Sequence, residues 1–266
     1  MRRSLLENLF FAPGGGSEKP SVWARCLNTA LLLGCLTWAA SGVLQHSGLR
    51  WDWEAVGAYW KLFAAGWGTT VAVSLGALAL STILGVLVAL AQRSRLLILR
   101  YAAKGYVELV RGTPLLAQIY ILFYIVAEAV HLENRTVAGV LTLSLFSGAY
   151  LAEVFRGGIE SVGRSQLESA QAIGLTRAQT YRHIILPQAL RVVLPALSGQ
   201  FVSLIKDSSL LSVIGLNELT QSARNVASYT FSNFESYLLL AAGYLVLTLP
   251  ISLWTRWLET HFRYET

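Results

Sequence analysis

The feature that most constrains this chain is a set of long apolar runs that recur along its length. Each run holds about 20 mostly apolar residues, the length that an α-helix needs to cross the roughly 30 Å hydrocarbon core of a bilayer. Six such runs lie at 23–44, 65–91, 114–131, 137–155, 192–214 and 236–255. Because lipid offers no hydrogen bonds to the backbone, runs of this length favour helices. The sequence therefore predicts an all-α membrane protein with six transmembrane helices.

Composition agrees with this prediction. Hydrophobic residues make up 54% of the chain and charged residues 14%, whereas soluble domains average about 25% charged residues. These values argue against a disordered chain and against a nucleic-acid-binding protein, although the net charge is +6. The two cysteines, Cys26 and Cys35, lie in the first apolar run. We expect them to act there as small apolar residues, and not as a disulfide or metal site.

The positive charges are sorted to one side of the predicted membrane. Of the 21 lysines and arginines, 16 fall in the tail 1–22 or at its junction with the first run, in the second and fourth connections, and at the C-terminus. By the positive-inside rule, both termini should be cytoplasmic, including the tails 1–22 and 258–266. Lys206 is different because it lies inside a predicted span.

The sequence lacks the common motifs for nucleotide binding, zinc proteolysis and serine hydrolysis. The chain contains no phosphate-binding Gly-x-x-x-x-Gly-Lys-Ser/Thr loop, no zinc-protease His-Glu-x-x-His and no Gly-x-Ser-x-Gly, and its four histidines are scattered. We therefore expect no catalytic residues, no metal site and no cofactor in this chain.

The connection 157–190, on the predicted cytoplasmic side, is long enough to need structure of its own or a partner. Two capping-box patterns predict two short helices, opening at Ser165-Gln166-Leu167-Glu168 and at Thr176-Arg177-Ala178-Gln179. Gly174 stands where the first helix should end, and Pro187 should stop the second near Leu186. Leu167, Ala170, Gln171 and Gly174 share one face of the first helix at helical spacing. Since so short a helix is marginal alone, we expect this face to dock on a partner.

This connection resembles the EAA loop of ATP-binding-cassette importer permeases. The residues that carry the likeness are Glu168, Ser169, Ala170, Gly174, Ile184, Leu186 and Pro187, with Ser169 in place of the usual alanine. The resemblance implies that these residues couple the chain to a cytoplasmic pair of ATPase subunits. ATP and Mg²⁺ would then be bound by those partners.

A second likeness narrows the class. Glu108 to Leu116, Lys206 to Leu210 and Gly68-Thr69-Thr70 resemble the polar-amino-acid permeases of these importers. The resemblance covers 62–257 and implies a five-helix type I core, to which 23–44 adds an N-terminal helix. It also implies a second permease subunit, identical or different, a periplasmic amino-acid-binding protein and a place in the bacterial inner membrane.

Polar residues within the spans are candidates for the substrate path, because ionisable groups at membrane depth are costly unless they are paired or hydrated. These candidates are Thr69, Thr70, Gln118, Tyr124, Glu153, Lys206, Asp207 and Ser208. Two alternatives stay open: an ion-coupled secondary transporter or channel that uses the ionisable residues as a proton relay, and a membrane scaffold without transport activity. The residues do not decide between an acidic and a basic substrate.

Overall fold

The computed structural model describes residues 22–46 and 51–262, and within these ranges the chain forms helices and no strands. It divides into two compact units, residues 1–51 and 52–266. The first contains helix α2 (Val22–His46), on which Cys26 and Cys35 are exposed. The predicted helix 23–44 falls on α2. The predicted tail 1–22 lies outside the described residues, apart from Val22.

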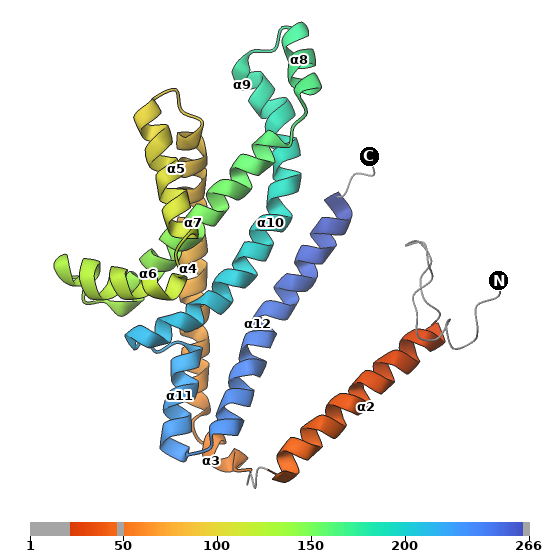
Figure 1. Ribbon diagram of the computed structural model, residues 1–266, viewed down its shortest axis with the longest axis vertical. Coiled ribbons are helices and arrows are strands. Elements are labelled where there is room, and N and C mark those ends of the chain that lie inside the picture. The colour runs from red at the N-terminus through yellow and green to blue at the C-terminus, as the bar shows by residue number, and fades with distance from the viewer. Residues whose placement is uncertain (1–21, 47–50, 263–266) are drawn as a thin grey trace. The chain divides into compact units, whose positions relative to one another are not determined.

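The second unit is a bundle of helices joined by short connections (Figure 1). Its first half contains α3 (Trp53–Gly57), α4 (Trp60–Gln92), α5 (Leu97–Arg111), α6 (Leu115–Ile121), η1 (Leu122–Ala127) and α7 (Arg135–Glu160). Its second half contains α8 (Arg164–Ala172), α9 (Arg177–Thr180), η2 (Tyr181–Ile185), α10 (Leu186–Asp207), η3 (Ser208–Ile214), α11 (Leu219–Thr230) and α12 (Asn233–Phe262). The short helices α8 and α9 lie at one end of this unit, and α3 and α11 lie at the opposite end (Figure 1).

Four helical segments of the described chain are long and apolar enough to cross a membrane: Trp60–Gln92, Arg135–Glu160, Arg177–Ile214 and Asn233–Thr260. The chain bends by 109° between Leu97–Arg111 and Leu115–Ala127. A fifth span is formed only if these two helices are counted as one broken span. In the first unit, only Val22–Cys35 counts as a shorter apolar helix. The structure thus confirms an all-α fold with four or five apolar spans, and the count of six stays a prediction.

Helix α5 was not predicted from the apolar runs. It is amphipathic, with Arg100, Lys104, Glu108 and Arg111 along one side. Gly112 and Pro114 separate it from α6, because proline lacks the backbone donor that would continue the helix. The Gln118 amide holds this break by donating to the carbonyl oxygens of Val110 at 2.7 Å and Thr113 at 3.2 Å.

Close approach of small residues fixes the packing of α4 against α7. A Cβ atom placed on Gly85 would lie 2.7 Å from Cβ of Leu151, and one placed on Gly148 would lie 2.8 Å from Cδ2 of Leu84. Such contacts let helix backbones approach closely where lipid offers no hydrophobic drive for association. Around this pair, the main core joins α4, α6, α7, α10 and η3 through Val73, Ala77, Leu115, Ile119, Leu143, Leu204, Leu211, Ile214 and Leu216.

Candidate functional site

The loop between α7 and α10 begins with α8, whose N-terminus differs from the prediction. The helix starts at Arg164, with Gly163 as its N-cap, and no side chain caps it. Ser165 therefore lies inside the first turn, and the predicted capping box with Glu168 is wrong. The reason is local: the chain enters the helix two residues earlier, with the amide of Gln166 donating to the carbonyl of Gly163 at 3.1 Å.

The turn after α8 matches the prediction. Gly174 has φ +79°, in the left-handed region that glycine adopts without a steric penalty. Its amide donates to the carbonyl of Gln171, and the amide of Leu175 donates to that of Ala170, both at 3.0 Å. This pair of bonds is the Schellman arrangement that closes a helix C-terminus.

The second capping box is confirmed. The amide of Gln179 donates to Oγ1 of Thr176 at 3.4 Å, and the amide of Thr176 donates to Oε1 of Gln179 at 2.9 Å. The predicted stop near Leu186 is wrong, because the chain stays helical from Arg177 to Ile214. Proline clashes with the carbonyl four residues before it in an α-helix. Here the wide π-helical turn Tyr181–Ile185 comes directly before α10, with Pro187 in its first turn.

The face of α8 that the loop leaves open matches the prediction only in part, because Gln171 and Gly174 are exposed but the other two predicted residues are not. Ala170 is only 1% exposed and Leu167 is half-buried, so these two side chains pack within the chain. The open face carries Glu168, Ser169 and Ala172, and Ile173 is 75% exposed where the helix ends. Among the remaining loop residues of the EAA likeness, Ile184 is half-buried, whereas Gly174, Leu186 and Pro187 are exposed.

A network of charged side chains joins three helices at the base of this loop. Glu153 on α7 accepts hydrogen bonds from Nε2 of Gln92 on α4 at 3.2 Å and from Nη2 of Arg156 at 2.7 Å. Its Oε2 also lies 3.6 Å from Nη1 of Arg111 on α5. Glu160, in the last turn of α7, accepts a bond from Arg156 at 2.6 Å. The residues leading into the loop are thus tied electrostatically to α4 and α5.

Sequence reasoning identified Glu153 as a candidate and missed its partners. A signal was present, because Glu153, Arg156 and Glu160 are spaced by three and four residues, the spacing of neighbours on a helix surface. The partners from α4 and α5 carry no such local signal. Gln92, Glu153, Arg156 and Glu160 border a cavity of about 370 Å³, which is lined by charges of both signs.

The structure does not gather the other path candidates at one place. Thr70 is fully buried and lies against the start of α11, whereas Gln118 is occupied in holding the break between α5 and α6. Thr69 donates to the carbonyl of Ala65 in its own helix at 3.1 Å. The Tyr124 ring is 56% exposed.

The last three candidates mark the end of α10. Lys206 is exposed and Asp207 is partly buried, and neither forms an ion pair within the described ranges. Ser208 is fully buried and donates to the carbonyl of Ile205 at 2.7 Å. The helix tightens here from α to 3₁₀ geometry, so the two charged residues stand at a change in backbone form.

A buried carboxylate at the opposite end of the unit was not predicted. Glu218 is 0% exposed and caps α11, accepting hydrogen bonds from the amides of Thr220 and Gln221 and from the Tyr244 hydroxyl, each at 2.8 Å. Oγ1 of Thr70 accepts a hydrogen bond from the amide of Leu219, the first residue of α11, at 3.1 Å. Burial raises the pKa of the Glu218 carboxyl, and the hydrogen bonds oppose that rise. This network ties α11 to α4 and α12.

Among the described residues, no group of three or more histidine, cysteine, aspartate or glutamate side chains could hold a metal ion. The arrangement consists of an open helical loop, a charged network at its base and a set of tightly packed spans.

Comparisons with known proteins agree with this reading of the fold. Residues 81–264 match the family described as the binding-protein-dependent transport system inner membrane component. The chain is 37% identical over 199 residues to the probable glutamine ABC transporter permease protein GlnM of Bacillus subtilis, covering 75% of this chain and 92% of that protein. It is 34% identical over 218 residues to the glutamine transport system permease protein GlnP of Escherichia coli, covering 81% and 99%. A crystal structure of an amino acid ABC transporter with histidines superposes with a TM-score of 0.75 at 34% identity, covering 80% of this chain and 100% of that one.

Proposed function

The chain belongs to the family of binding-protein-dependent transport system inner membrane components, and on that premise we propose that it carries a polar amino acid across the bacterial inner membrane. Permease subunits of these ABC transporters are not enzymes themselves. Energy would come from ATP hydrolysis in a partner pair of ATPase subunits, which bind ATP and Mg²⁺. The glutamine permeases among its relatives make glutamine the first substrate to test.

The observation that carries this proposal is the open face of α8. A nine-residue helix gains little stability alone, yet this one is closed by a Schellman turn and leaves an isoleucine 75% exposed at its end. Such a surface fits a groove of a partner protein. We propose that Glu168, Ser169, Ala170, Gly174, Ile184, Leu186 and Pro187 form the coupling loop, with Ala170 holding α8 against its own chain.

Movement of the coupling loop would reach the spans through the charged network at its base. Glu160 lies directly before the loop, and Arg156 links it to Glu153, which contacts α4 and α5. A shift of α8 would therefore move α7 together with α5 and the break that precedes α6. Discontinuous helices of this kind commonly border substrate sites in transporters.

We further propose that Lys206, Asp207 and Ser208 border the substrate path. The Lys206 side chain is exposed, and it lies in a segment that is long and apolar enough to span the membrane. An unpaired charge at membrane depth is costly unless it faces water or a partner. A second permease subunit packed beside this one would supply both the other wall of the path and an aqueous surface for the charge. In this arrangement, a soluble amino-acid-binding protein delivers substrate at the outer face and both termini of the chain are cytoplasmic.

Uptake by the complete complex in sealed proteoliposomes tests the energy source. With the binding protein outside and ATP inside, glutamine uptake should depend on ATP and should withstand an uncoupler. Uptake that persists without ATP and collapses with the uncoupler would instead indicate an ion-coupled transporter.

Gly174 offers a matched pair of variants for the same assay. Gly174→Arg should block uptake, because it adds a long charged side chain at the end of the open face. Gly174→Asn should retain uptake, because asparagine adopts the left-handed backbone that this position needs. Equal uptake by both variants would contradict the coupling role.

A further inference from the structure

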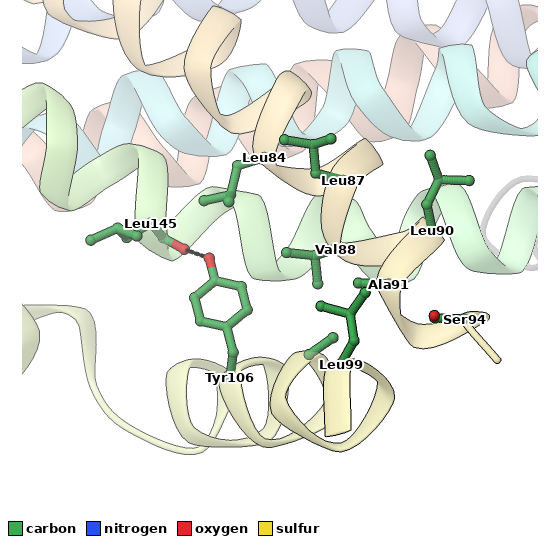
Figure 2. A pocket seen from close by; sticks show the side chains of 10 residues that line it. Leu84, Leu87, Val88, Leu90, Ala91, Ser94, Leu99, Tyr106 and Leu145 are labelled. Atoms are coloured by element: carbon green, nitrogen blue, oxygen red, sulfur yellow. Dashed lines mark hydrogen bonds between the residues drawn. The ribbon is translucent and has the colours of Figure 1, made fainter. Parts of the chain in front are cut away.

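An open apolar groove runs between α4 and α5. It encloses about 660 Å³ and is lined mainly by leucine side chains, among them Leu84, Leu87, Leu99 and Leu145. Figure 2 shows Leu84, Val88 and Ala91 of α4 on the side toward Leu99 and Tyr106 of α5. The inner end is closed by the Tyr106 hydroxyl, which donates to the carbonyl of Leu145. At the other end of the groove, the lining includes one polar residue, Ser94.

The groove fits within one bilayer leaflet. Its lining on α4 extends from Leu84 to Ala91, which at 1.5 Å per residue is about 11 Å, and Ser94 lines it just beyond the end of that helix. One leaflet contributes half of a hydrocarbon core of roughly 30 Å. Leu87 is 58% exposed and Leu90 is 53% exposed, so the groove is open along its side.

The turn that contains Ser94, at one end of the groove, is rich in arginine. Arg93, Ser94 and Arg95 form the turn between α4 and α5, and Nε and Nη2 of Arg100 donate to the carbonyl of Ser94 at 3.0 and 2.8 Å. Nη1 of Arg93 lies 3.6 Å from Oε1 of Glu160, and both Arg93 and Arg100 line the neighbouring charged cavity. The Arg95 side chain is exposed and makes no hydrogen bond or ion pair with the part of the chain that the structure describes.

The same turn leads into the uncapped N-terminus of a 15-residue helix. Leu96 is the N-cap of α5, no side chain caps the helix, and its first turn holds no acidic residue. The free amides and the dipole at such an end favour an anion. An apolar groove, an arginine-rich turn and an uncapped helix end therefore adjoin one another.

We propose that this groove binds an anionic phospholipid, with one acyl chain between α4 and α5 and the phosphate beside Arg95 and the first turn of α5. Basic pockets between helices on the cytoplasmic side of a membrane bind acidic lipid headgroups in this way. The inference goes beyond the proposed transport function and takes from it only the cytoplasmic position of the α4–α5 turn. The lipid would brace α5, the helix that leads into the break before α6.

Native mass spectrometry of the full-length chain in its detergent-solubilised complex tests the proposal. Dioleoylphosphatidylglycerol should bind at least about five-fold more tightly than dioleoylphosphatidylcholine, since each basic residue near a headgroup contributes roughly that factor. Arg95→Gln should remove about that preference and Arg95→Lys should keep it. Arg224→Gln, which alters an exposed arginine on α11, is the matched control and should change nothing.

The acyl-chain part of the site has its own variant. Ala91→Phe fills the groove and should weaken binding of both lipids while the complex stays assembled. Equal binding of the two lipids by the wild type, or equal effects of Arg95→Gln and Arg224→Gln, would overturn the proposal. So would unchanged lipid binding by Ala91→Phe, competition by inorganic phosphate alone, or loss of the second permease subunit from Ala91→Phe, which would show that a protein surface covers the groove. Because binding is measured without transport, failure here leaves the transport proposal standing.

Discussion

Two adjacent glycines near the end of α7 give a matched test of how the coupling loop is anchored. A Cβ atom on Gly158 would lie 2.5 Å from Cγ2 of Val193 and 3.3 Å from the carbonyl oxygen of Ala189, both on α10. A Cβ atom on Gly157 would meet no atom within 4 Å. Replacing each by alanine therefore makes the same chemical change, and only Gly158→Ala disturbs the contact between α7 and α10.

The difference between the two variants isolates the cost of that contact. Alanine stabilises a helix interior by about 0.5–1 kcal/mol relative to glycine, and this gain is common to both variants. Forcing an extra methyl into a packed contact costs about 1–3 kcal/mol. Gly158→Ala should therefore be less stable than Gly157→Ala by about 1–3 kcal/mol. For a chain of this size, that difference corresponds to a gap of about 2–12 °C in melting temperature.

Thermal unfolding of the purified chain in detergent measures this gap. Val193→Ala removes the nearest atom, so it should restore part of the stability of Gly158→Ala and show non-additivity in the double variant. It should have no such effect on Gly157→Ala. Melting temperatures of the two glycine variants within about 1 °C of each other would refute the packing argument.

The charged network and the buried carboxylate give further predictions. Glu153→Gln should lower the melting temperature by about 2–4 °C, because exposed arginine partners limit the loss to about 1 kcal/mol. Glu108→Gln is the control, and the effect should shrink in high salt; an equal loss in both variants would contradict the network. Since burial raises the pKa of Glu218 above its ordinary 4.5, the folded state holds that proton more tightly than the unfolded state. Stability should therefore fall as pH rises through the raised pKa, and melting curves between about pH 5 and about pH 8 should lose this dependence in Glu218→Gln. A dependence that survives the substitution would have another origin.

Much of the helical framework could be predicted because apolar runs are local signals. Five predicted runs fall on α4, on α6 with η1, on α7, on α10 with η3, and on α12. Helices α5 and α11 were missed because charged or polar residues occupy one side of each, so neither gives a continuous apolar run in the sequence. The run 114–131 was predicted to be one complete span. In the structure, the helical segment Leu115–Ala127 is shorter and counts as a span only together with α5.

Within the candidate site, local chemistry was predictable and long-range contact was not. The caps at Gly174 and Thr176 depend on neighbouring residues alone, and both were predicted correctly. Pro187 was misread because the π-helical turn before it is a feature of the backbone that no residue pattern announced. The Glu218 network joins residues from three helices, with Thr70 bonded to an amide 149 positions away, so it has no signature in sequence spacing.

The central claim is that the open face of α8 docks on an ATPase subunit. Ala172 is exposed on that face, so substitutions there should leave the fold within about 0.5 kcal/mol of the wild type. The direct measurement is the amount of ATPase subunit that co-purifies from membranes with the wild type, with Ala172→Ser and with Ala172→Arg. The wild type and Ala172→Ser should retain the ATPase, and Ala172→Arg should lose it while still inserting in the membrane. Full retention of the ATPase by Ala172→Arg would contradict the claim.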